Sequence, residues 1–384
     1  MFRIASFNVE NLFDRPKALN GATWAEGRPI LQAYKEVNEL FALDPYTEPT
    51  KRRIRDLLIA LDIYAVNQHG AVRRKLVKDP TWAWLRKNRG SFDREPADTT
   101  KSVEIIATGR SDWIGWVELA KEPVDETATR MTAKVILELE ADIMGVVEAE
   151  DRPALARFNR ELLGGRYRHV MLVDGNDDRG IDVGILTRDR FDIATIRSNV
   201  DALDPATGKP IFDRDCPQYQ VVTPDGAVVH VLLNHFKSQS GGGGARRKLQ
   251  ATEVRRIADG LVAAGQHVVV AGDLNEGPAQ EGAFAENLRP LVTNNSPLIP
   301  CYTLDGFDVG SKPGTFDACG LRNRLDYILI SDSLRPHFAG GGIFRKGLWG
   351  SRVTRPTAWE TYPEITRSAE GASDHAAIFV DLDL

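Results

Sequence analysis

Short apolar runs alternate with longer amphipathic stretches along most of the chain. Runs of strand length, bounded by Gly, Asp or Pro, lie at residues 3–9, 143–148, 183–187, 228–234, 268–271, 326–331 and 377–380. Residues 127–140 and 245–264 instead carry apolar side chains at helical spacing among Lys, Arg and Glu. This mixture predicts an α/β protein in which helices lead directly into strands.

Residues 40–124 show a different pattern. They include the charged segment 51–55 and four tryptophans, but none of the acidic motifs found elsewhere. We expect a single domain over residues 1–384 with an insertion at about 40–124, packed on one edge of the main fold. Core packing is the expected role of Trp82, Trp84, Trp113 and Trp116, and stacking on bases or sugars is the alternative.

Composition excludes several classes of protein. The 384 residues are 42% hydrophobic and 27% charged, without a long low-complexity tract, as in a globular protein. No apolar run approaches the roughly 18 residues of a membrane span, so none is predicted. The first eight residues alternate polar and apolar side chains and leave no room for a cleaved export signal, so we expect a cytoplasmic location.

Cysteine and charge content narrow the chemistry further. Cys216, Cys301 and Cys319 form no C-x-x-C pair, which argues against a zinc site or a redox disulfide. The net charge of −5 argues against a protein that coats nucleic acid through bulk positive charge. It is compatible with an enzyme whose metal-binding carboxylates make the chain acidic until the metal binds.

Several predicted strands begin or end with an acid, an amide or a histidine. Residues two apart in an extended segment share a face, which pairs Asn8 with Glu10 and Asp273 with Asn275. The other motifs supply Glu148, His235 with Lys237, Asp326, and Asp374 with His375. One acid at a strand end is more often a turn former or a helix cap, but six such motifs in one chain indicate a site. Oxygen ligands suit Mg²⁺ or Mn²⁺, and a neighbouring histidine suits proton transfer.

This series of motifs resembles the endonuclease/exonuclease/phosphatase superfamily, which includes pancreatic deoxyribonuclease, exonuclease III-type apurinic endonucleases, neutral sphingomyelinases and inositol polyphosphate 5-phosphatases. The motifs span residues 6–380, and the segment 40–124 is the main departure. The segments 179–184 and 234–238 most resemble bacterial nuclease-like members. The resemblance implies a four-layer α/β sandwich, in which two mostly antiparallel sheets pack face to face between helices, with the active site at one end of the sheets.

The resemblance also implies roles for the motif residues. Glu148 would bind the divalent metal, with Asn8, Glu10 and Asp374 as further ligands or close neighbours. Asp326 would orient His375, and Asp273 would orient or deprotonate the attacking water. Asn275 would hydrogen-bond the phosphate or that water, and His235 would contact a phosphate oxygen or help to protonate the leaving group.

Several cations are weaker candidates. Arg179 and Lys237 are predicted to contact substrate phosphates, with a solvated loop position as the alternative. Arg246, Arg247 and Lys248 follow a glycine run and are candidates to grip a polynucleotide backbone, or else form a solvated helix start. That glycine run lacks the pattern of a nucleotide-binding P-loop.

We therefore predict a metal-dependent phosphodiester hydrolase that uses Mg²⁺ or Mn²⁺, most readily a nuclease with a nucleic-acid substrate and no protein partner. The alternative is a phosphatase or phosphodiesterase acting on a lipid or a small phosphorylated metabolite, since fold does not decide substrate. An inactive interaction module is least favoured, because every motif keeps a chemically competent side chain. The sequence leaves open DNA or RNA, endonuclease or exonuclease, and one metal or two.

Overall fold

The computed structural model describes residues 1–12, 14–19, 24–77, 79–123, 126–177, 180–239, 242–293, 295–350 and 358–384. The chain divides into two compact units. Unit 1 comprises Met1–Phe13 and Asp125–Leu384, and unit 2 comprises Asp14–Val124. Unit 2 begins well before residue 40, where the sequence pattern places the start of an insertion.

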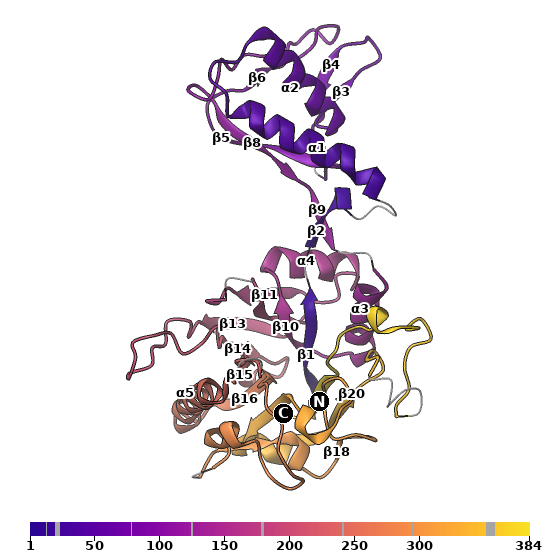
Figure 1. Ribbon diagram of the computed structural model, residues 1–384. Coiled ribbons are helices and arrows are strands. Elements are labelled where there is room, and N and C mark those ends of the chain that lie inside the picture. Colours follow the sequence, from indigo (N-terminus) through magenta and orange to yellow (C-terminus); the bar gives the residue numbers. More distant parts are fainter. Residues whose placement is uncertain are drawn as a thin grey trace. The chain divides into compact units, whose positions relative to one another are not determined.

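Two mixed sheets form the centre of unit 1 (Figure 1). The described part of the first sheet has the order β11 (His169–Val173), β12 (Asp182–Thr187), β10 (Ile143–Ala149), β1 (Phe2–Leu12), β21 (Ala377–Leu382), β20 (Phe338–Phe344) and β18 (Phe307–Asp308). The second has the order β13 (Asp192–Arg197), β14 (Gln218–Val222), β15 (Val228–His235), β16 (His267–Asp273), β19 (Asp326–Ser331) and β17 (Leu298–Pro300). Most neighbouring strands are antiparallel, but β1 with β10, β15 with β16 and β18 with β20 are parallel.

The two faces of each central strand contribute side chains to different hydrophobic cores. On β1, Ile4 belongs to a core that also contains residues of the second sheet, whereas Phe7 packs with the helices α3 (Thr127–Leu139) and α4 (Arg152–Glu161). On β16, Val269 joins the core shared by both sheets, and Val270 packs with α5 (Gly244–Ala263). Strands that are covered on both faces need continuous apolar runs, which explains the apolar runs of the sequence.

These observations confirm the mixed α/β class with sheets flanked by helices. The remaining regular elements of unit 1 are short 3₁₀ turns: η2 (Glu286–Leu291), η3 (Cys301–Thr303), η4 (Leu321–Asn323), η5 (Asp332–His337) and η6 (Ser368–Glu370). No helix in the described parts of the chain is long and apolar enough to cross a bilayer.

Unit 2 has its own core and its own small sheets. It contains β2 (Asp14–Pro16), η1 (Lys17–Leu19), α1 (Trp24–Phe41), α2 (Glu48–Ala60), β3 (Tyr64–Val66), β4 (Val72–Arg74), β5 (Ala83–Arg89), β6 (Asp93–Arg94), β7 (Glu104–Ile105), β8 (Ile114–Leu119) and β9 (Lys121–Pro123). Phe41, Phe92 and Trp113 pack ring against ring at its centre. Trp113 is fully buried, as expected for a core tryptophan, but Trp116 is 45% exposed, so the core interpretation is wrong for that residue.

Candidate active site

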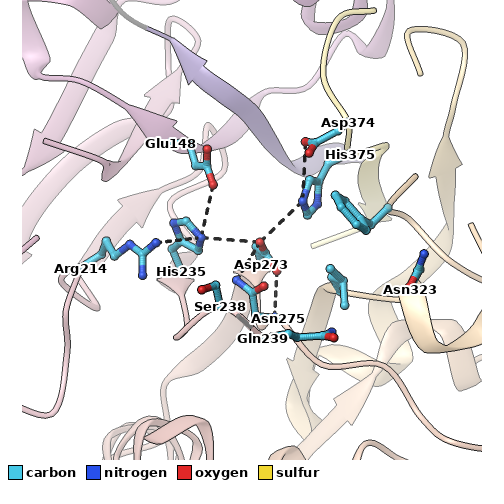
Figure 2. Close-up of a pocket in the computed structure, with 12 residues that line it drawn as sticks. Glu148, Arg214, His235, Ser238, Gln239, Asp273, Asn275, Asn323, Asp374 and His375 are labelled. Carbon is cyan, nitrogen blue, oxygen red and sulfur yellow. Dashed lines mark hydrogen bonds and ion pairs between the residues drawn. The ribbon is translucent and has the colours of Figure 1, made fainter. Parts of the chain in front are cut away.

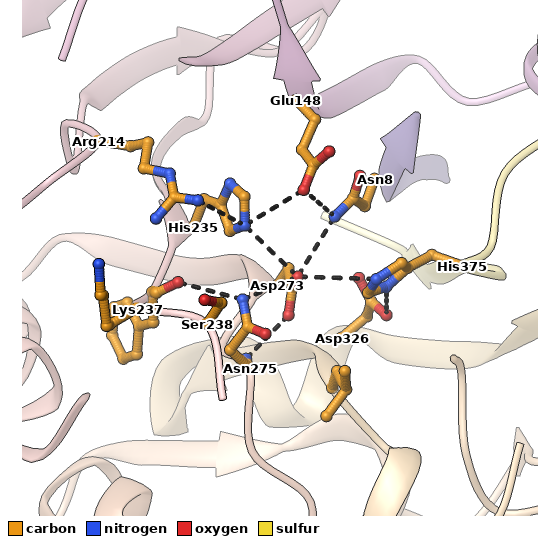
Figure 3. A network of polar contacts seen from close by, with 12 residues as sticks. Asn8, Glu148, Arg214, His235, Lys237, Ser238, Asp273, Asn275, Asp326 and His375 are labelled. Atoms are coloured by element: carbon orange, nitrogen blue, oxygen red, sulfur yellow. Dashed lines mark hydrogen bonds and ion pairs between the residues drawn. The ribbon is translucent and has the colours of Figure 1, made fainter. Parts of the chain in front are cut away.

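The strand register brings together side chains from five strands at one edge of unit 1 (Figure 3). In the second sheet, His235 pairs with Asp273, and Asp273 pairs with Asp326, so the three residues form one row across neighbouring strands. In the first sheet, Asn8 on β1 pairs with Val147 on β10, the residue that precedes Glu148. Parallel strands end at the same edge of a sheet, which explains why motifs far apart in the sequence meet.

Local backbone distortions aim the first-sheet side chains. The ladder of β1 shifts register after Asn8, and that of β10 shifts between Val147 and Ala149. Glu10, Glu148 and Asn275 have φ angles of 51°, 68° and 57°, in the left-handed region that residues other than glycine rarely occupy. Bulges and such strained residues concentrate at functional sites, because they turn a side chain out of the regular ladder.

Asp273 lies at the centre of the polar network. Its Oδ1 accepts the backbone N–H of Asn275 at 2.8 Å, and its Oδ2 accepts the side-chain amides of Asn275 at 3.1 Å and Asn8 at 3.3 Å. The side chain is almost fully buried. Burial raises the pKa of Asp273 and the nearby carboxylates of Asp326 and Glu148 raise it further, while His375 and the Asn275 amide oppose the rise. Asp273 is therefore a carboxylate with an unusually high proton affinity.

Two imidazoles face Asp273 from opposite sides. Nε2 of His235 lies 3.7 Å from Oδ2 of Asp273 and 3.5 Å from Oε1 of Glu148. Nε2 of His375 lies 3.9 Å from the same Asp273 oxygen. The opposite nitrogen of His375, Nδ1, is 2.8 Å from Oδ2 of Asp326. A carboxylate behind an imidazole fixes its tautomer and orientation.

Burial alone would lower the pKa of His375, but the charges of Asp326 and Asp273 and the hydrogen bond to Asp326 outweigh it, so the pKa of His375 is raised. Backbone contacts hold both partners of this pair in place. The N–H of Asp326 donates to Oγ1 of Thr315, and the N–H of His375 donates to Oγ of Ser373. The site thus places a proton-accepting carboxylate beside a proton-holding imidazole.

A cavity of about 300 Å³ opens onto this network (Figure 2). Its lining includes residues that the sequence analysis did not predict, and the charged one among them is Arg214. Its guanidinium is almost fully buried, with Nε 3.3 Å from Oδ2 of Asp177 and Nη2 3.5 Å from Nε2 of His235. Arg214 stands between Asp213 and Asp215 in a loop before β14, where no apolar periodicity marks it as buried. The full lining is Glu148, Arg214, His235, Ser238, Gln239, Asp273, Asn275, Phe316, Asn323, Leu325, Asp374 and His375.

Glu10 and Asp374 lie on the first-sheet side of the network. The N–H of Asp374 donates to Oε2 of Glu10 at 2.9 Å, and the N–H of Glu10 donates to Oδ1 of Asn8 at 3.0 Å. Burial and then the charge of Asp374 raise the pKa of Glu10. Asn8 uses its other amide atom, Nδ2, to bridge Glu148 and Asp273. Asn8 therefore positions the carboxylates around it.

Two sets of side chains are candidate ligands for a divalent cation. The carboxylates of Glu10, Glu148 and Asp374 offer the hard oxygens that Mg²⁺ and Mn²⁺ prefer. Among the described residues, only Asp273, Asp326 and His375 form a group of three whose ligand atoms lie within 4.8 Å of one another, and Oδ1 of Asp326 is buried without a hydrogen-bond partner there. Because Nδ1 of His375 already contacts Asp326, the oxygen-only set agrees better with a hard cation.

The structure gives a different outcome for each cation that the sequence analysis proposed as a phosphate contact. Arg179 lies outside the described residues. Nζ of Lys237 is 3.7 Å from Asp213 and does not line the cavity (Figure 3). Arg247 is buried, with Nε 2.7 Å from Oε2 of Glu276 and Nη1 bonded to the carbonyls of Lys237 and Ser238. The sequence interpretation of Arg247 as a backbone-gripping or solvated residue is therefore wrong, because it holds the loop in place.

Sequence comparison supplies the class of protein. The Endonuclease/Exonuclease/phosphatase family matches residues 125–375, so the chain belongs to this family of phosphoester hydrolases. This confirms the resemblance inferred from the motifs. No curated protein sequence matches the chain at a significant level.

Solved structures with a similar fold include a mannosyl-6-phosphatase from Bacteroides thetaiotaomicron, with 17% identity and a TM-score of 0.49, which covers 67% of this chain and 91% of that one. The truncated TDP2 of Caenorhabditis elegans has 17% identity and a TM-score of 0.44, with 67% and 91% covered. The catalytic domain of human nocturnin with bound sulfate has 15% identity and a TM-score of 0.47, with 67% and 86% covered.

Proposed function

We propose that the protein is a divalent-metal-dependent phosphodiester hydrolase that cleaves nucleic acid. One observation carries the proposal: a buried Asp273 carboxylate lies between Nε2 of His235 and Nε2 of His375, and Asp326 supports the latter. This arrangement places a base and two imidazoles around one small cavity. No serine or cysteine nucleophile is needed, because water is the attacking group in such a site.

The residues divide the work of hydrolysis between them. Asp273 holds the attacking water and accepts its proton, which its raised proton affinity favours. Asn275 is anchored to Asp273 and keeps its side chain beside that water. His375, charged and fixed by Asp326, stabilises the negative charge that develops on the phosphoryl oxygens. His235 donates a hydrogen bond to a phosphate oxygen or to the leaving oxygen.

Glu148, Glu10 and Asp374 are the residues that would hold Mg²⁺ or Mn²⁺, with Asn8 positioning Glu148. The cation would supply Lewis-acid stabilisation of the phosphoryl oxygens. Arg214 adds a fixed positive charge to the same cavity, where a planar guanidinium suits a phosphate. Lys237 and Arg179 remain proposed contacts for phosphates farther along the substrate.

The domain arrangement is part of the proposal. We assign unit 1 as the catalytic domain, with the four-layer order of helices, sheet, sheet and helices. We assign unit 2 as an insertion into it, after β1 and before α3.

A second function, the hydrolysis of a small phosphorylated metabolite, is favoured by the cavity volume. About 300 Å³ is at the small end of ligand sites and would hold a phosphate with one modest substituent. A polynucleotide would place one phosphodiester in the cavity and extend beyond it. The two functions therefore differ in whether the substrate must continue outside the cavity.

The test compares four substrates with Mg²⁺, with Mn²⁺ and with EDTA. They are bis-p-nitrophenyl phosphate, p-nitrophenyl phosphate, supercoiled plasmid and a single-stranded oligonucleotide in DNA and RNA form. We expect metal-dependent cleavage of the diester and the polynucleotides, lost in His375→Ala and kept in His69→Ala, an exposed histidine of unit 2. Activity on the monoester alone would favour the metabolite phosphatase. Full activity of His375→Ala would refute the mechanism.

A further inference from the structure

Unit 2 contains a groove that belongs to no part of the catalytic site. It lies between α1 and β8 and has a volume of about 640 Å³. Its lining includes the aromatic residues Tyr34, Phe41 and Trp116, the cations Lys35 and Arg110, and the acid Glu39. Asn38 fixes the groove, because its side chain accepts the N–H of Val117 at 2.8 Å and donates to the carbonyl of Val117 at 3.1 Å. These two hydrogen bonds hold α1 against β8 on one side of the groove.

The exposed ring of Trp116 is the main feature of this groove. On β8 it stands directly opposite Arg86 of β5, and the guanidinium of Arg86 lies 5.0 Å from the centre of the Trp84 ring. Two indoles and a guanidinium thus share one face of the β5–β8 ribbon, which Figure 1 shows beside α1. An exposed aromatic ring beside a groove offers a flat apolar surface on which a planar ligand can stack.

Cations without an ionic partner among the described residues lie on β5, the strand that pairs with β8. Arg86 is neutralised by Glu118 at 3.0 Å, and Lys35 lies 3.8 Å from Glu39. The next cations on β5 are different. Lys87 pairs in register with Gly115, which lines the groove, and Arg89 pairs with Ile114. Both side chains are exposed, and neither has an ionic partner among the residues that the structure describes.

The net charge of unit 2 differs in sign from that of the rest of the chain. Residues 14–124 carry 19 Lys and Arg against 16 Asp and Glu, whereas the rest of the chain carries 30 against 38. An anionic ligand is therefore favoured on unit 2 far more than on the remainder of the chain.

We propose that this surface, defined by Tyr34, Trp116, Lys87 and Arg89, binds a single-stranded polynucleotide. Unpaired bases stack on the rings that line the groove, and the backbone phosphates contact Lys87 and Arg89. A duplex buries the faces of its bases, so it offers the indole nothing to stack on. An acidic peptide would satisfy the cations but leave the rings uncovered. This inference rests on the proposed nuclease function and names its substrate class.

The test measures binding of a short labelled oligothymidylate to the full chain by fluorescence anisotropy, in EDTA so that no cleavage occurs. We expect Trp116→Ala to weaken binding by about 5-fold or more, the loss of one stacked base, and Trp116→Tyr to restore most of it. The double variant Lys87→Ala with Arg89→Ala should reduce the slope of log affinity against log salt by roughly 1.4, the effect of two phosphate contacts.

Matched control variants show whether a loss of oligonucleotide binding is specific to the proposed surface. Leu76→Ala removes an apolar side chain of unit 2 that is 82% exposed, away from the groove lining. The double variant Arg94→Ala with Lys101→Ala removes two exposed cations that have acidic partners. Both control variants should bind the oligonucleotide as the natural chain does. A matching RNA oligonucleotide shows which sugar is preferred.

Three results would overturn the inference: unchanged binding in the Trp116 and cation variants, equally tight binding of the matching duplex, or complete displacement by polyglutamate, which would indicate an acidic polypeptide partner. Failure of the proposed function is recognised separately, because it would appear as no metal-dependent cleavage of bis-p-nitrophenyl phosphate by the natural chain. Oligonucleotide binding in EDTA does not depend on that cleavage.

Discussion

Unit 1 buries a cluster of charged side chains, whereas many ion pairs of unit 2 are exposed to solvent. In unit 1, Asp273, Asp326, His235, His375 and Arg214 are all less than 10% exposed. In unit 2, ion pairs such as Arg94 with Glu104 and Arg86 with Glu118 are exposed on both sides. Removing charges from water costs several kcal/mol per ion unless partners compensate, whereas an exposed pair contributes about 0–1 kcal/mol.

This difference indicates where each unit holds its function. A cluster of buried, mutually interacting charges is maintained at the expense of stability, and such clusters mark sites of chemistry. Exposed ion pairs carry no such cost and no such information. In unit 2 the informative features are instead the ones without partners, namely the exposed ring of Trp116 and the cations Lys87 and Arg89.

The largest expected effect follows from removing the central buried charge. Asp273→Asn keeps the size of the side chain but removes the proton acceptor, so we expect turnover of bis-p-nitrophenyl phosphate to fall by about 10²–10⁴-fold. Asp381→Asn, which removes a carboxylate from the half-buried pair with Arg3, is the matched control and should retain turnover. Circular dichroism of both variants checks that they are folded. Retained turnover in Asp273→Asn would contradict its role as the base.

The strands that position the buried site could be predicted from the sequence, because they are apolar on both faces and end in polar residues. The predicted strand at 326–331 matches β19, and the helix at 127–140 matches α3 to within one residue. Register then follows from parallel pairing, which brings the motif residues to one edge. An apolar run that ends in a polar residue limits the register of its strand, because a shift of the pairing by one residue would move the polar end into the core.

Unit 2 and the loops were less predictable. Its boundary lies at Asp14 because the two short strands β2 and β9 pair with each other, a contact between residues more than a hundred positions apart. Arg214 was missed because its burial depends on the packing of a loop without periodicity. Arg247 was misjudged because its partner Glu276 is remote in sequence. Contacts of this kind leave no local pattern from which to infer them.

Metal binding should stabilise unit 1 and not depend on turnover. With Mg²⁺ or Mn²⁺ at about 100 times the dissociation constant, linkage predicts about 2.7 kcal/mol of added stability, and therefore a higher Tm. Glu148→Gln should abolish most of the increase, because it removes a hard oxygen charge from the proposed ligand set. Glu118→Gln, on the surface of unit 2, should leave the increase intact. An equal rise of Tm in Glu148→Gln would place the cation elsewhere.

Arg214 provides a smaller test of buried charge. Its replacement by alanine should reduce kcat/KM for the diester by about 10- to 150-fold, the loss of charge-assisted hydrogen bonds worth about 1.5–3 kcal/mol. Arg214→Lys should recover only part of this, because an ammonium lacks the planar fork of the guanidinium. Arg197→Ala, on exposed β13, is the control. Equal recovery by lysine would show that charge alone matters.

The smallest effects compare one buried and one exposed carboxylate. Burial raises the pKa of Asp182 to about 6, so the folded state holds a proton that the unfolded state has already released above about pH 4. Stability of the natural chain should therefore fall as pH rises from about 4 to about 6, and Asp182→Asn should remove this loss, a gain on the order of 1–3 kcal/mol at pH 7.

Glu104→Gln is the counterpart in unit 2. It breaks an exposed pair with Arg94 and should change stability by less than about 0.5 kcal/mol across the same range of pH. Urea unfolding at several pH values measures both variants. Asp182→Asn keeps an oxygen that can accept the N–H of Gly175, which the carboxylate now accepts at 2.7 Å, so the substitution isolates charge from hydrogen bonding. If the two variants gave equal effects, burial would not distinguish the charges of the two units, and the contrast between them would lose its energetic basis.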